Sequence, residues 1–216
     1  QQIQQLQLNG FQHFVIIHGT DTLSYAAATL ARFLGHSCHA IITGSQYPLL
    51  NIEGNDTREF TDAIGNLYLA LEQVLALPSG VYLAFHEQVF HAQSTLKAHT
   101  TELDAFVGIR AHQSCDTTAD ALIVPNEYIE QAAELSVLNL MLQPIAKQQF
   151  ILQLKNLLLS PPNFLVLQGF GTGNIAVNDE ILALFEQLYQ QRCLPIISTQ
   201  VTFGQLDQRY AVSSWI

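Results

Sequence analysis

The chain has 216 residues, of which 49% are hydrophobic and 12% are charged, and its formal net charge is −10. This charge argues against nucleic acid and against an anionic membrane surface as partners, because both attract clustered Lys and Arg side chains. No apolar run approaches the roughly 18 residues that a membrane-spanning helix needs, and the length suits one large domain or two small ones.

The first half of the chain alternates strands and helices. The continuous apolar run 14–17 is typical of a strand buried on both faces. The pattern predicts further strands at 38–44 and 80–86 and helices at 24–34 and 61–77. Gly35 is a plausible stop for the first helix, and Thr61 or Asp62 a plausible cap for the second. This order predicts a parallel sheet wrapped by helices.

The second half repeats the alternation after a break in rhythm. The stretch from about Gly108 to Ala121 is small and polar, and we place an interdomain linker at 116–134. Strands are then expected at 135–142, 163–170 and 194–199, with helices near 145–159 and 178–191. The sequence therefore predicts an α/β fold: a Rossmann-like parallel sheet flanked by helices at 1–115, with a second, smaller α/β domain at 135–216.

The cysteines and histidines favour neither a disulfide framework nor a metal site. Cys38, Cys115 and Cys193 are odd in number and far apart, so reduced, intracellular thiols are the simpler interpretation. No carboxylate or cysteine lies at ligand spacing from the two close histidine pairs, His36 with His39 and His86 with His91. We therefore expect no metal and no cofactor.

Three polar segments follow predicted strands, at the edge where open parallel sheets carry their functional residues. They are HGTDT (18–22), TGSQYPL (43–49) and GFGTGN (169–174). In the first, Thr20 offers a hydroxyl nucleophile or water-orienting group, and Asp21 an acceptor for a cationic substrate group. The alternative is that Asp21 or Thr22 only caps the following helix. GFGTGN lacks the full G-x-G-x-x-G pattern, so it is a weak nucleotide signal.

A threonine hydroxyl needs a base, and Lys97 is the only lysine among the first 146 residues. It lies just after the third predicted strand, in AQSTLKAHTTELDAF. A lysine in a partly desolvated pocket can accept a proton, although most lysines are solvated surface residues. As a base, Lys97 must lie near Asp21 and about 2.6–3.2 Å from the Thr20 hydroxyl.

Together these segments resemble the L-asparaginase family, bacterial amidohydrolases that also include glutaminase-asparaginases. HGTDTLSYAAATL resembles the second of the family's two active-site signatures, and ITGSQYPL with TDAIGNLYLAL the next loop and helix. FHAQSTLKAHTTELDAF resembles the segment that supplies the catalytic lysine, while LQGFGTGNIA and ISTQVTFGQLDQRYA resemble landmarks of the smaller C-terminal domain. The resemblance covers almost the whole chain.

The resemblance implies a role for each matching residue. Thr20 would be the second active-site threonine, Asp21 the ligand of the substrate α-amino group, and Lys97 the lysine of a Thr-Asp-Lys triad. Thr20 and Asp21 would bind substrate together with Ser45, which lies where the family's loop approaches the scissile amide. The implied reaction is hydrolysis of L-asparagine to L-aspartate and ammonia through an acyl-enzyme, without a cofactor.

The chain also departs from the family pattern. The first signature, a strand ending in Thr-Gly-Gly that carries the usual nucleophile, is expected upstream of residue 1, and the end of the C-terminal domain is expected beyond residue 216. Gln93 stands where many members carry arginine. We therefore expect the 216-residue chain by itself to be inactive on asparagine.

The resemblance also implies partners and surroundings. The GSQ-PL loop is closer to the cytoplasmic type I branch, and the expected assembly is a homodimer or homotetramer acting on L-asparagine or also L-glutamine. One alternative is an ammonia-supplying subunit of a tRNA-dependent amidotransferase, whose basic tRNA-binding surface a chain at −10 lacks. Another is a catalytically inactive binding domain that retains the triad by descent.

Overall fold

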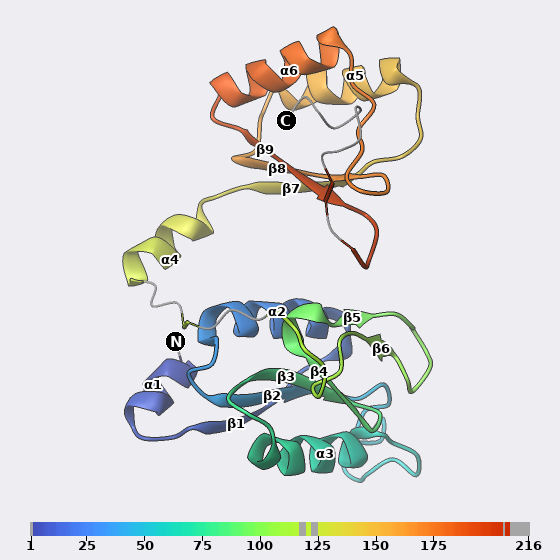
Figure 1. Cartoon of the computed structure of the whole chain (residues 1–216). Helices are drawn as coiled ribbons and strands as arrows, with labels where there is room; N and C mark the ends of the chain where they lie inside the picture. The colour runs from blue at the N-terminus through green and yellow to red at the C-terminus, as the bar shows by residue number, and fades with distance from the viewer. Residues whose placement is uncertain (1, 117–119, 122–124, 205, 208–216) are drawn as a thin grey trace. The chain divides into compact units, whose positions relative to one another are not determined.

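The predicted alternation of strands and helices is present in the computed structural model, which describes residues 2–116, 120–121, 125–204 and 206–207. The chain divides into two units, Gln1–Ile123 and Val124–Ile216 (Figure 1). Each unit has its own parallel sheet and its own apolar core. The α/β fold class with parallel sheets flanked by helices is therefore confirmed.

The first unit is built on a four-stranded sheet of order β1-β2-β3-β4. Its strands β1 to β3 are parallel, whereas β4 returns antiparallel to β3. Two short strands, β5 and β6, form a separate antiparallel ladder. The bounds are α1 (Gln2–Leu8), β1 (His13–Ile17), η1 (Thr20–Thr22), α2 (Leu23–Leu34), β2 (His39–Thr43), α3 (Ala63–Ala76), β3 (Gly80–Phe85), β4 (Gln88–His91), η2 (Ala92–Ser94), β5 (Leu96–Lys97) and β6 (Phe106–Val107).

Helices α2 and α3 cover opposite faces of this sheet (Figure 1). Successive residues of a strand point to opposite faces, so Ile42 packs in the cluster of α2 whereas Ile41 packs in the cluster of α3. Both isoleucines are fully buried, which explains why the middle of β2 is apolar on both faces. The loops at the carboxyl ends of β1, β2 and β3 consequently gather at one edge of the sheet.

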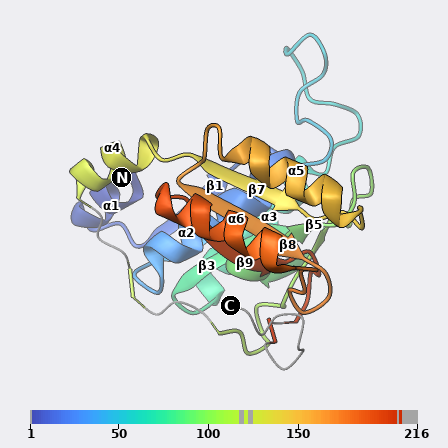
Figure 2. The same ribbon diagram turned by 90° about the horizontal axis from the view of Figure 1, so that it is seen from above.

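The second unit contains a three-stranded parallel sheet of order β7-β8-β9. Helices α5 and α6 lie over one face of it, in front of the strands in Figure 2. The bounds are α4 (Asn126–Ala133), β7 (Val137–Met141), α5 (Lys147–Leu157), β8 (Phe164–Gly169), α6 (Asp179–Gln190) and β9 (Leu194–Thr199). Helix α4 lies within the stretch 116–134 that the sequence predicts as a linker. The domain bounds on either side of this linker, 1–115 and 135–216, stay a prediction.

The predicted helix caps are confirmed only in part: the Thr61 hydroxyl accepts a hydrogen bond at 3.1 Å from the N–H of Ala63, the first residue of α3. Thr22 occupies the N-cap of α2 and Asp62 that of α3, yet neither side chain makes a capping hydrogen bond. The Asp62 carboxylate accepts hydrogen bonds from the backbone N–H groups of Gln46 and Tyr47 instead. A carboxylate at the start of a helix can accept hydrogen bonds from the first N–H groups of that helix or from those of a neighbouring segment. Here the donors belong to the loop after β2.

Helix α1 and strands β5 and β6 were not predicted, because they leave little trace in an apolar pattern. Helix α1 buries none of its residues, so its glutamine-rich sequence carries no apolar periodicity. Strands β5 and β6 are two residues long each. Strand β4 is joined to β3 by a two-residue turn, His86-Glu87, that contains no glycine or asparagine.

The β3–β4 turn provides a stability prediction. His86 and Glu87 have φ values of 44° and 62°, the left-handed conformation that a type I′ turn requires at both positions. Since asparagine and glycine adopt it at lower cost, His86→Asn with Glu87→Gly should raise the free energy of unfolding by about 1–2 kcal/mol. The midpoint of urea unfolding measures this, and an unchanged or lower midpoint would contradict it. The backbone N–H of residue 86 keeps its hydrogen bond to Asn66.

Candidate active site

The segment HGTDT lies directly beyond β1, at the carboxyl edge of the first sheet. Ile17 is paired with Thr43, and the His18 N–H donates to the Thr43 carbonyl at 2.8 Å, so β1 and β2 end level with each other. Thr20 and Asp21 then form the 3-10 turn η1 that leads into α2. This order brings the polar turn and the loop after β2 to the same edge.

Lys97 reaches this turn from β5. Its Nζ donates a hydrogen bond to Thr20 Oγ1 at 2.9 Å and lies 3.4 Å from Asp21 Oδ1. The first distance falls inside the range expected for a base, although the residues are 77 positions apart in sequence. Three of the four predicted site residues therefore come together in space.

The β5–β6 ladder holds Lys97 in place. Lys97 is paired with Phe106, which is buried and packs against Phe85 with ring centroids 4.7 Å apart. The Lys97 side chain is itself only 19% exposed, so its aliphatic stem is largely covered and its amine has little freedom to leave the turn.

Asp21 is placed quite differently, with 98% of its side chain exposed. An ion pair with so open a carboxylate adds little stability, because water screens it. The exposure leaves most of the carboxylate accessible to a cationic group arriving from solvent. The arrangement thus joins a sheltered amine–hydroxyl pair to an exposed anion, which suits proton transfer beside a bound ammonium group.

Ser45 lies in the loop after β2 and is half-buried. Among the described residues, its hydroxyl forms no hydrogen bond with Thr20, Asp21 or Lys97. Its neighbour Gly44 is the residue that meets the turn. A Cβ at position 44 would lie 2.3 Å from the His18 carbonyl oxygen and 3.6 Å from Thr20 Cγ2. The loop after β2 therefore packs directly against the threonine turn.

Sequence reasoning missed Gly44, although a glycine directly after a buried strand is a signal of close backbone approach. Gly44→Ala should lower the free energy of unfolding by about 1–3 kcal/mol, because the added methyl group overlaps the His18 carbonyl and the backbone must move. Thermal unfolding measures the loss.

Gly65→Ala is the matched control for that substitution. Gly65 lies in α3 with nothing within 4 Å of an added Cβ, so alanine should raise the free energy of unfolding by about 0.5–1 kcal/mol. Equal effects at positions 44 and 65 would mean that the close approach at Gly44 is unimportant.

Sequence reasoning also missed a buried polar network behind the loop. Asn66 is 3% exposed, and its Nδ2 donates to the Gly44 carbonyl at 2.9 Å. The sequence signal was available: an asparagine one helical turn beyond Asp62, at a position where α3 faces the protein interior. Buried amides need partners, so its presence there pointed to a fixed polar contact.

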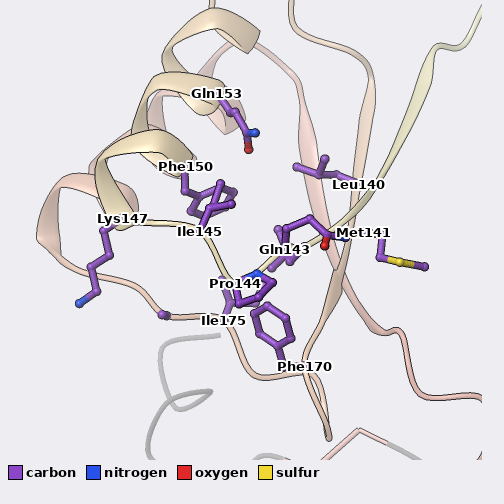
Figure 3. A pocket seen from close by; sticks show the side chains of 12 residues that line it. Leu140, Met141, Gln143, Pro144, Ile145, Lys147, Phe150, Gln153, Phe170 and Ile175 are labelled. Carbon is purple, nitrogen blue, oxygen red and sulfur yellow. The ribbon is translucent and has the colours of Figure 1, made fainter.

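GFGTGN lies in the second unit and contributes to a pocket of about 430 Å³ near the carboxyl ends of β7 and β8. Figure 3 shows Pro144, Ile145, Phe150 and Phe170 around this pocket, while the Lys147 side chain extends outward. A mostly apolar lining does not suit a phosphate group, and the pocket contains none of the predicted site residues.

The cysteines are unpaired, and burial raises the pKa of the Cys38 and Cys193 thiols, which keeps them protonated in the two cores. Within the described ranges, no three His, Cys, Asp or Glu side chains are grouped closely enough to hold a metal ion. None of the helices described there is both long and apolar enough to cross a membrane.

Comparison with known proteins gives three kinds of similarity. The family model described as "Asparaginase, N-terminal" matches residues 1–128. L-asparaginase 1 of Escherichia coli K12 is 26% identical over 208 residues, which cover 91% of this chain and 59% of that protein. A glutamyl-tRNA(Gln) amidotransferase subunit of Haloquadratum walsbyi is 26% identical over 216 residues, covering 93% of this chain and 47% of that protein.

A crystal structure from Campylobacter jejuni, named "Probable Cytoplasmic L-asparaginase", has the same fold. The TM-score is 0.72 at 19% identity, and the match covers 99% of this chain and 67% of that one. At this identity the similarity shows the fold alone. The chain spans 59% of the length of the Escherichia coli relative and 47% of that of the Haloquadratum relative.

Proposed function

The chain belongs to the asparaginase family, and from that premise we propose that its full-length protein hydrolyses L-asparagine to L-aspartate and ammonia. Family membership supports an amidohydrolase. The single observation that carries the proposal further is the 2.9 Å contact between Lys97 Nζ and Thr20 Oγ1, beside Asp21. A bound asparagine would place its α-ammonium group on the Asp21 carboxylate, which is open to solvent.

In the proposed mechanism one threonine is the nucleophile and a second, Thr20, passes a proton to Lys97. The family's other threonine, which the resemblance places before residue 1, attacks the side-chain amide carbon of asparagine. The hydroxyl of this threonine gives up its proton, the amide nitrogen gains it and leaves as ammonia, and an acyl-enzyme ester remains. Lys97 takes a proton through Thr20 from the incoming water as the water attacks the ester carbon, and this proton then passes to the departing oxygen of the first threonine, which releases L-aspartate.

Ammonia release from asparagine by the purified full-length gene product tests this proposal. We expect release from L-asparagine, with L-glutamine assayed in parallel to establish the preference between these linear amides. Release from neither amide would reject the proposal in favour of an inactive binding domain of the same fold.

The amidotransferase alternative keeps one point in its favour, the similarity to the Haloquadratum amidotransferase protein along 93% of the chain. The charge of the chain counts against this alternative, because tRNA is an anion and the chain has a net charge of −10 with only 8 Lys and Arg side chains. An ammonia-supplying subunit would bind tRNA with a strong salt dependence, so tRNA retention at about 50 mM but not about 200 mM salt would favour it.

We also propose a cytoplasmic homodimer or homotetramer. Four large apolar residues lie along one side of α3 at heptad-like spacing, and each is 47–74% exposed: Ile64, Tyr68, Leu71 and Leu75. Such a stripe is the kind of surface that packs against another helix. Light scattering of the full-length protein should give a mass of two or four subunits, and Leu71→Glu should lower it. A monomer that is fully active at low concentration would contradict this.

A further inference from the structure

Asn66 connects the carboxyl ends of two strands through a buried side chain. Its Nδ2 donates to the Gly44 carbonyl, beyond β2, and to Asp62 Oδ2 at 3.0 Å. Its Oδ1 accepts from the backbone N–H of His86, beyond β3, at 2.9 Å. Both donors and the acceptor of the amide are therefore used, as a residue 3% exposed requires.

Asp62 extends this network along the loop. Its Oδ2 accepts from the Gln46 N–H at 3.0 Å and its Oδ1 from the Tyr47 N–H at 2.9 Å. Hydrogen bonds to an ionised acceptor are about twice as strong as neutral ones. Together with the bond from Asn66 to Gly44, they tie the backbone on both sides of Ser45.

The network also reaches the segment that follows Lys97. The Gln46 side-chain amide donates to the carbonyls of Thr100 and Glu102 at 3.1 and 2.9 Å. One side of the loop therefore contacts the turn that holds Thr20, through Gly44, and the other side contacts the chain leaving Lys97. Asp62 and Asn66 lie behind the loop and join these two contacts.

We infer that Asp62 and Asn66 are positioning residues, which set the loop 44–47 and thereby the placement of Thr20 relative to Lys97. This inference rests on the proposed function for its effect on rate. Neither side chain touches Thr20 or Lys97 through a hydrogen bond, so both act through the backbone of the loop and through Gln46. A misplacement of about 1 Å can cost on the order of 10² in rate.

The test compares two substitutions in α3 of the full-length protein. Asn66→Ala removes the three hydrogen bonds, whereas Val74→Ala removes only apolar packing, since Val74 is 5% exposed in the cluster on the α3 face. We expect Asn66→Ala to lower kcat for asparagine by about 10² with a smaller change in KM, and Val74→Ala to lower the melting temperature while kcat stays near wild type. Equal loss of kcat in variants of matched melting temperature would overturn the inference.

A second readout does not depend on turnover. Asp62→Asn retains one acceptor oxygen in place of two and should accelerate hydrogen exchange at the amides of Gln46 and Tyr47, and it should shift the NMR signal of the Lys97 amine. If the wild-type protein hydrolyses no amide, the proposed function fails, and this readout alone decides the inference. Unchanged exchange and an unchanged Lys97 signal in the folded variant would overturn it.

Discussion

Lys97→Met in the full-length protein should lower the rate of asparagine hydrolysis by about 10²–10⁴, the usual contribution of a positioned base. Methionine has a similar length and fills the largely covered stem position, so the fold should persist. What is lost is the amine 2.9 Å from the Thr20 hydroxyl. No second lysine occurs among the first 146 residues to replace it.

Lys155→Met is the control for this experiment. The Lys155 amine contacts Glu180 at 2.8 Å on an exposed surface of the second unit, so its loss removes a surface ion pair and nothing from the site. Initial rates at saturating asparagine should match wild type for Lys155→Met. If Lys97→Met also retained the wild-type rate while folded, Lys97 would not be the base.

Thr20→Val should reduce the rate by a comparable factor of about 10²–10⁴, because the hydroxyl and the amine act as one unit. Valine keeps the branched shape, including the methyl group that faces Gly44, and removes only the oxygen that accepts the Lys97 hydrogen bond. The double variant should be little slower than either single variant, since members of one catalytic unit are non-additive.

Multiplicative losses in the double variant would instead mean that Thr20 and Lys97 act independently, and the proposed division of labour would fail. Thr22→Val provides the matched control. Thr22 is exposed, lies two residues further along the same turn and makes no capping hydrogen bond with its side chain. Its substitution should leave the rate near wild type, which single-turnover measurements would establish.

Most of the fold could be read from apolar spacing. The predicted strand 194–199 coincides with β9, and the predicted helix 24–34 differs from α2 by one residue. Spacing of this kind reports which faces of an element are buried, and burial on both faces predicts a parallel sheet. Helix α1 was not predicted because it buries none of its residues, and strands β5 and β6 were not predicted because two residues are too few to show an apolar period.

The candidate site was only partly accessible from the sequence. The chemistry of Thr20, Asp21 and Lys97, together with the family resemblance, was enough to select them, and the position of polar segments after strands indicated one shared edge. Ser45 was selected for its place in the loop, and its role stays a prediction. The network of Asp62 and Asn66 was missed.

Sequence alone therefore determined the order of elements and the residues with suitable chemistry, because periodicity and residue type are local properties. Only the tertiary structure decided which polar groups meet. Asp62 could have capped α3, yet it binds the loop because that loop presents two backbone N–H groups to it. Likewise, the contact between Lys97 and Thr20 depends on the β5–β6 ladder and on how the chain returns to the sheet edge. Such long-range partners follow from packing, which no local pattern encodes.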